Sequence, residues 1–178
     1  LSRTNGNGHT TTYEYDIYGY LTKLIHPDGA FRLFTFDALG NLISKTDENG
    51  NTTTYEYDKM DRQVKETNAL GYPTVYVYDG VGNLIEHINK KGNSTTYVYS
   101  GLGQLLSTTT PEGITTSKEY DTRGNVKLSI DGNGNKTTFK YNIRNQLIEE
   151  TDPLGNSRSF DYDAVGNMIA QSDRMGNF

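Results

Sequence analysis

The sequence predicts an all-β fold, a repetitive antiparallel meander of β-hairpins that curls into a strip wound as a spiral or open barrel. Three observations predict it. A short unit recurs every 21 residues without insertion or deletion. The stretches between its glycines alternate polar and apolar residues with a period of two. None of these stretches is long enough for a stable amphipathic helix. We therefore expect about sixteen strands of about six residues, joined by tight turns.

The phase of the repeat is marked by an aromatic residue, which an aspartate usually follows. It occupies Tyr15, Phe36, Tyr57, Tyr78, Tyr99, Tyr120, Tyr141 and Tyr162. We predict that residues 8–178 are eight tandem repeats in a single repeat domain, preceded by a partial repeat or frayed N-terminus over residues 1–7. Because the sequence begins with Leu1 and both ends fall inside the pattern, we expect a fragment of a longer protein.

The first half of each unit predicts a strand and a turn, as in Thr10–Tyr15 followed by Asp16. Thr and Tyr favour strands. The turn reads Asp-x-x-Gly-Asn, where Asp bonds forward to backbone amides and Gly supplies a positive φ. This order predicts a type I turn followed by a left-handed residue and a bulge. Asp61 and Asn145 replace the glycine in two units, and both residue types tolerate the left-handed region.

The second half predicts another strand and another turn. Leu42 and Ile43 exemplify a strand that is apolar on both faces beside the first turn and polar towards its far end. An Asx residue usually opens the following connection and glycine lies near its close, as in residues 47–51. We expect neighbouring coils or other parts of the parent chain to cover both sides of the sheet at this apolar rim.

The aromatic residues predict two rows on one face of the first strands. Period-two alternation places the pairs on that face. They are Tyr13 and Tyr15, Phe34 and Phe36, Tyr55 and Tyr57, Tyr76 and Tyr78, Tyr97 and Tyr99, Phe139 and Tyr141, and Phe160 and Tyr162, with Tyr120 alone beside Lys118. We expect them to stack as ladders that face the interior or another coil, with the Glu, Thr and Lys face outward.

Composition excludes several function classes. The net charge of -5 and the pI near 5.2 argue against nucleic-acid binding and against anionic membranes. No apolar run approaches the ~20 residues of a transmembrane helix. The absence of cysteine excludes a disulfide framework.

The repeated phrase Gly-Asn-x-Thr-x-Tyr-x-Tyr-Asp-x-x-Gly-Asn-Leu resembles the YD repeats of Rhs proteins, wall-associated bacterial proteins, the C component of Tc toxins and the teneurins. The resemblance extends from Gly8 to Phe178. It implies a strip that spirals into a hollow shell, and in the toxin members a shell that encloses a variable C-terminal toxin. The family's closing signature with its aspartic self-cleavage site is not visible. Asp152-Pro153-Leu154-Gly155 looks like part of it, but Asn156 follows where the signature has an apolar residue, so we do not transfer cleavage.

The candidate chemical groups have plainer structural explanations. The aspartate after the aromatic residue could be catalytic, but it recurs at the turns, which explains it better; it lies at Asp16, Asp37, Asp58, Asp79, Asp121 and Asp163. Residues 47–51 and 131–135 offer alternating oxygen ligands for calcium but lack the later glutamate of an EF-hand. His9, His26 and His87 lie far apart without cysteine partners, so we predict neither a zinc site nor a catalytic triad.

Two further patterns leave room for binding. The aromatic rows could stack on sugars, against the alternative that they are the structural face of the sheet. Asn51, Asn93 and Asn135 match the glycosylation acceptor pattern, but they fall on the repeated phrase.

We therefore predict a structural segment with no catalytic, cofactor-binding or metal-binding residue and no cofactor. Its expected partners are the C-terminal toxin or effector of the parent protein and adjoining repeats, in a secreted or cell-surface protein. The alternative is an adhesion module that binds glycans or cell-surface proteins, and an enzyme is the least supported reading.

Overall fold

The computed structural model describes residues 1–175, and every regular element in this range is a β-strand. No helix there could cross a membrane. The strands are β1 (Ser2–Thr4), β2 (Thr10–Tyr15), β3 (Leu21–Ile25), β4 (Phe31–Phe36), β5 (Leu42–Thr46), β6 (Thr52–Tyr57), β7 (Gln63–Thr67), β8 (Pro73–Tyr78), β9 (Leu84–Ile88), β10 (Ser94–Tyr99), β11 (Leu105–Thr109), β12 (Thr115–Tyr120), β13 (Val126–Ile130), β14 (Lys136–Tyr141), β15 (Leu147–Thr151), β16 (Ser157–Tyr162) and β17 (Met168–Gln171). The predicted all-β class is confirmed.

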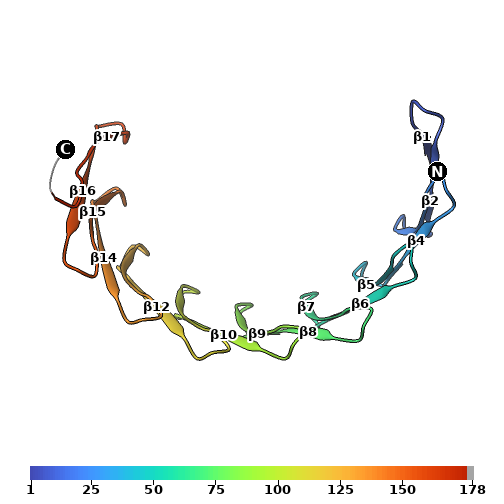
Figure 1. Cartoon of the computed structure of the whole chain (residues 1–178), viewed down its shortest axis with the longest axis horizontal. Helices are drawn as coiled ribbons and strands as arrows, with labels where there is room; N and C mark the ends of the chain where they lie inside the picture. The colour runs from blue at the N-terminus through green and yellow to red at the C-terminus, as the bar shows by residue number, and fades with distance from the viewer. Residues whose placement is uncertain (176–178) are drawn as a thin grey trace. The chain divides into compact units, whose positions relative to one another are not determined.

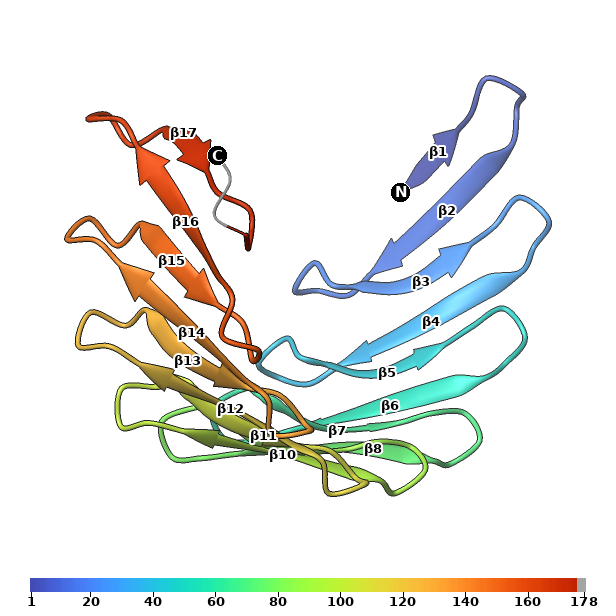
Figure 2. The same ribbon diagram turned by 60° about the vertical axis from the view of Figure 1, so that its left-hand side comes forward.

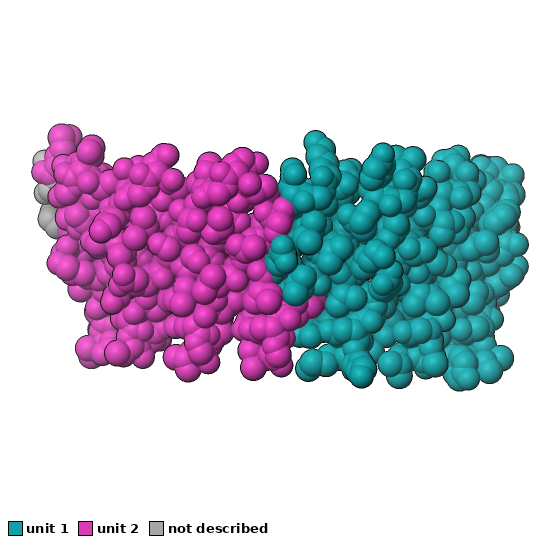
Figure 3. Space-filling model, turned by 90° about the horizontal axis from the view of Figure 1, so that it is seen from below, with its two compact units in different colours: residues 1–77, 86–93 teal, residues 78–85, 94–178 magenta. Residues whose placement is uncertain are grey.

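The chain divides into two compact units, which Figure 3 distinguishes by colour. Unit 1 comprises residues 1–77 and 86–93, and unit 2 comprises residues 78–85 and 94–178. Within each unit, successive strands pair antiparallel in chain order, so that hairpins lie side by side (Figures 1 and 2). Each unit is therefore an open antiparallel meander, as the repeat predicts.

Strand β1 extends the pattern at the N-terminus. Its three residues pair with β2, with Ser2 opposite Thr12 and Thr4 opposite Thr10. This segment has the phase of a second strand, which is where a partial repeat would place it. It raises the number of strands among the described residues to seventeen, one more than expected.

The predicted first turn is confirmed. In residues 37–41 the Gly40 amide donates to the Asp37 carbonyl at 3.1 Å, and the Asp37 amide donates to the Asn41 carbonyl at 2.9 Å. Gly40 has a φ of 91°, and the two predicted non-glycine exceptions, Asp61 and Asn145, have φ values of 58° and 61°. The second turns, such as residues 47–51, close with the same two backbone bonds.

The hairpins made by a first and a second strand contain another bulge, inside the second strand, which the sequence did not predict. In the hairpin of β4 and β5, Phe36 lies opposite Leu42 and Thr35 opposite Ser44, so Ile43 has no partner. Lys45 consequently lies opposite Phe34, on the same face as Leu42. Uninterrupted alternation along β5 would place Leu42 and Ser44 on the same face of the sheet. The register shows that this expectation is wrong. An extra residue on one strand bends it and increases its twist.

Each unit is a single layer of sheet, and the described residues form almost no buried core. Among the described residues only Phe160 (6% exposed) and Ser172 (3%) are classed as buried. The aromatic residues on the first strands are mostly half-buried against their strand neighbours. The chain exposes 11769 Å², whereas a globular monomer of its mass would expose about 8,700 Å².

Candidate functional site

The carboxylates of the first turns lie at one end of the hairpins, where each holds its own loop closed. The Asp37 Oδ1 accepts the amides of Leu39 at 2.9 Å and Asn41 at 2.8 Å, and its Oδ2 accepts the Asn41 side-chain amide at 3.1 Å. Asp79 and Asp163 repeat these contacts. Chain reversal leaves these amides without strand partners, and the aspartate satisfies them.

These bonds also set the ionisation of the turn carboxylates. The backbone bond from Asn41 is the main cause that lowers the pKa of Asp37 below 3.8. The side-chain bond from Asn83 is the main cause that lowers the pKa of Asp79. A carboxylate stabilised in its charged form is a poor proton donor near neutral pH. The recurring aspartates therefore act as turn acceptors, and their geometry offers no acid-base pair.

Neighbouring first turns are linked to each other by side-chain amides. The Asn41 Nδ2 also donates to the Asp61 Oδ1 at 3.0 Å, and the Asn125 Nδ2 donates to the Asn145 Oδ1 at 3.0 Å. Asp61 and Asn145 are the two residues that replace glycine in the left-handed position. Each substitution therefore adds a bond to the preceding repeat, which offsets part of its backbone strain.

The phenols of the first strands are also used by the backbone. Tyr57 donates its hydroxyl to the Leu42 carbonyl at 3.0 Å, and Tyr120 and Tyr162 make the equivalent bonds to Leu105 and Leu147. Burial is the main cause that raises the pKa of Tyr57 above 10.0. These hydroxyls fasten one hairpin to the preceding one and are not presented to a ligand.

The expected stacking of equivalent rings across the sheet does not occur in this form. Equivalent first strands are separated by a second strand, so their rings repeat at about 10 Å, beyond ring contact. The stacked ring pair found among the described residues is Tyr20 with Phe36, with centroids 5.0 Å apart. The contact of Tyr20 could not be predicted from the repeat, because Tyr20 lies in the turn and outside both aromatic rows.

Two of the other candidates, His9 and His26, line one hollow together with Pro27 and Asp28, which the sequence did not predict, whereas the remaining candidates lie apart. Asp131 uses Oδ1 to accept the amides of Asn133 and Asn135, and Oδ2 to accept the Asn135 side chain, so its oxygens are occupied by the turn. His26 contacts Glu48 at 2.8 Å, whereas the ring of His87 lies 5.3 Å from Tyr76. Within residues 1–175 no group of three or more metal-ligating side chains is found.

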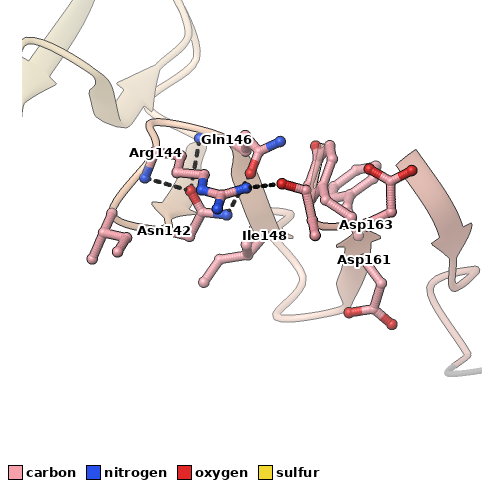
Figure 4. A pocket seen from close by; sticks show the side chains of 10 residues that line it. Asn142, Arg144, Gln146, Ile148, Asp161 and Asp163 are labelled. Atoms are coloured by element: carbon pink, nitrogen blue, oxygen red, sulfur yellow. Dashed lines mark hydrogen bonds between the residues drawn. The ribbon is translucent and has the colours of Figure 1, made fainter. Parts of the chain in front are cut away.

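A hollow with a volume of about 390 Å³ lies between neighbouring turns of unit 2. Figure 4 shows the side chains that line it. The Arg144 guanidinium crosses it and donates to the Ala164 carbonyl at 2.6 Å. Gln146 donates to the Gly166 carbonyl at 3.2 Å. Asp163 accepts the turn amides already described, so the polar groups of this hollow connect and close turns. The arrangement provides mechanical coupling between repeats and contains no nucleophile paired with a base.

Comparisons with known proteins agree with this geometry. A family model described as RHS Repeat matches residues 1–30, 36–73, 78–116, 120–156 and 141–177. Curated protein sequences gave no significant match. Similar solved structures include TcdB2-TccC3 without its hypervariable C-terminal region, with a TM-score of 0.69 and 19% identity over 96% of this chain. The Photorhabdus luminescens Tc holotoxin pore matches with a TM-score of 0.57 and 17% identity over 96% of this chain. This chain spans 12% of the length of each.

Proposed function

Because the chain belongs to the RHS repeat family, we propose that it is a structural segment in the wall of a larger protein shell. The observation that carries the proposal is the single-layer sheet. It exposes 11769 Å² and has almost no buried core among its described residues. An enzyme scaffold normally surrounds its site with a packed interior. A repeating strip whose turns are tied to one another is suited to forming a wall.

We further propose that the parent protein encloses a toxin or effector at its C-terminus. One similar structure lacks a hypervariable C-terminal region, and this chain spans only 12% of that protein. By analogy, adjoining repeats would complete the wall and the C-terminal segment would be the cargo. The parent protein would then be secreted or displayed on the cell surface. These statements extend the fold likeness and are proposals for this chain.

The segment itself is proposed to carry out no catalysis. Its recurring carboxylates accept turn amides, and three of its phenols donate to backbone carbonyls. No observation favours the adhesion alternative, because neither the structure nor the comparisons identify a sugar-binding arrangement of the aromatic residues.

Limited proteolysis of the full parent protein tests the enclosure. The parent should be expressed intact and treated with a broad-specificity protease, and the survival of its C-terminal segment followed by mass spectrometry. We expect the C-terminal segment to survive inside the intact parent and to be digested rapidly when expressed alone. Equal digestion rates in the two settings, or a parent gene with no segment beyond the repeats, would refute enclosure.

A further inference from the structure

Two neighbouring second turns of unit 1 form a groove that is both apolar and basic. It is lined by Asn68, Leu70, Tyr72, Lys90 and Lys91 and has a volume of about 380 Å³. Residues 68–72 connect β7 to β8 and residues 89–93 connect β9 to β10. We call this surface the Leu70–Lys91 groove.

The residues that open these two turns carry no charge. Some second turns open with aspartate, as at Asp47, Asp131 and Asp152, whereas these two open with Asn68 and Asn89. The asparagines make the same turn bonds. The Asn68 Oδ1 accepts the amides of Leu70 and Tyr72 at 3.0 Å, and the Asn89 Oδ1 accepts the amide of Lys91 at 2.9 Å. The fold of the turn is kept while its negative charge is absent.

The groove combines exposed apolar side chains with exposed lysines. Leu70 is 80% exposed and Tyr72 is 55% exposed. Lys90 and Lys91 are exposed as well, and neither has an ion pair with any residue in the described range. Lys65, by contrast, is held by Glu56 at 2.8 Å. In a protein with a net charge of -5, the groove is a local basic surface next to exposed apolar side chains.

We propose that the Leu70–Lys91 groove binds an acidic segment of a partner protein, in which an apolar side chain is flanked by carboxylates. The apolar side chain would cover Leu70 and Tyr72, and the carboxylates would pair with Lys90 and Lys91. The volume accommodates one or two side chains. Two lysines are too few for an anionic membrane, which typically needs clusters of about 4 to 8 cations. The groove has no arginine for bidentate phosphate recognition.

Fluorescence anisotropy with the complete chain tests the proposal. The probe is a labelled hexapeptide, Asp-Glu-Leu-Phe-Glu-Asp, titrated at low ionic strength. We expect saturable binding that weakens when the ionic strength is raised to about 0.5 M, because exposed charges are then screened. We expect Lys90→Glu with Lys91→Glu to weaken binding about tenfold or more, since two attractions become repulsions.

Matched variants separate the groove from general charge effects. Lys45→Glu with Lys59→Glu makes the same charge change at two exposed lysines of unit 1 outside the groove and should leave most of the affinity. Leu70→Ser should weaken binding while leaving the circular dichroism spectrum unchanged. A peptide with lysines in place of its acidic residues should not bind.

Three outcomes would overturn the proposal. One is no binding of the acidic peptide at millimolar concentration, and another is equal loss of affinity in both double-lysine variants. The third is self-association of the chain through this surface, seen as sedimentation that depends on concentration and is abolished by Leu70→Ser, with no peptide binding. The proposal does not depend on whether the parent protein encloses a cargo.

Discussion

At Gly40 both the backbone conformation and the packing oppose a side chain. Gly40→Ala should therefore destabilise the chain more than Gly50→Ala does. Gly40 has a φ of 91° and Gly50 a φ of 81°, so both substitutions place a side chain in the left-handed region. That strain costs about 1 to 2 kcal/mol for an alanine. A β-carbon on residue 50 would meet nothing within 4 Å, so the strain is its whole expected effect.

At residue 40 the new β-carbon would also lie 2.7 Å from the Cζ of Tyr20 and closer still to its hydroxyl. The Tyr20 ring must therefore move, although it stacks on Phe36 with centroids 5.0 Å apart. Losing such a ring pair costs a further ~0.5 to 1.5 kcal/mol. We expect Gly40→Ala to lower the free energy of unfolding by about 1.5 to 3.5 kcal/mol, which is the sum of the two contributions.

Urea denaturation followed by circular dichroism measures both variants. A Tyr20→Ala background provides the control, because without the phenol Gly40→Ala should cost no more than Gly50→Ala. Equal costs for Gly40→Ala and Gly50→Ala in the wild-type background would refute the packing argument. An unchanged cost of Gly40→Ala after Tyr20→Ala would do the same.

The remaining predictions concern the phenol bonds and pH. Tyr57→Phe removes the hydroxyl bond to Leu42 and should lower the free energy of unfolding by about 1 kcal/mol in urea denaturation. Tyr15→Phe is the control, since Tyr15 is 46% exposed, and equal losses would contradict the role of the bond. The pKa values of Asp37 and Asp79 are lowered from 3.8, so their stabilisation is present above pH 3.8 and lost as pH falls through the folded values. The urea concentration at the midpoint of unfolding should decrease as the pH falls below 3.8, and the decrease should be smaller in Asp37→Asn. A midpoint that does not change with pH would contradict the role of these aspartates in closing the turns. The pKa values of Tyr55 and Tyr57 are raised above 10.0, mainly by burial, so the phenols favour folding below pH 10 and this is lost as pH rises through the folded values. Spectrophotometric titration should detect phenols that ionise at a higher pH than an exposed tyrosine. Ionisation of all phenols at the pH of an exposed tyrosine would contradict the burial of Tyr55 and Tyr57.

The sequence allowed the strands and turns to be predicted because their determinants are local. Gly40 and its equivalents require a positive φ, Asp37 caps the turn, and the spacing never slips, so hairpin pairing follows from the repeat. Asp61 and Asn145 were identified as tolerated exceptions for the same reason. The bond from Asn41 to Asp61 was not predicted, because it joins residues whose proximity depends on the register between hairpins.

The second bulge was missed because nothing in the local sequence signals it. Ile43 reads as an ordinary strand residue, and only its lack of a partner opposite Phe36 and Thr35 reveals the insertion. That error carried over to the faces of the second strand, where Lys45 joins the aromatic side. The Leu70–Lys91 groove was missed for a related reason. Replacement of Asp by Asn68 and Asn89 reads as conservative turn chemistry, and its electrostatic effect appears only when adjacent turns are placed together.

We propose above that this chain forms part of the wall of a protein shell, and that another segment of the parent protein carries its activity. Electron cryomicroscopy of the complete parent protein tests it most directly. We predict that residues 8–178 form a continuous single-layer strip in the wall of a hollow enclosure, with density for the C-terminal segment inside it. A parent in which this strip is covered by a packed core, or in which the C-terminal segment lies outside the enclosure, would contradict the claim.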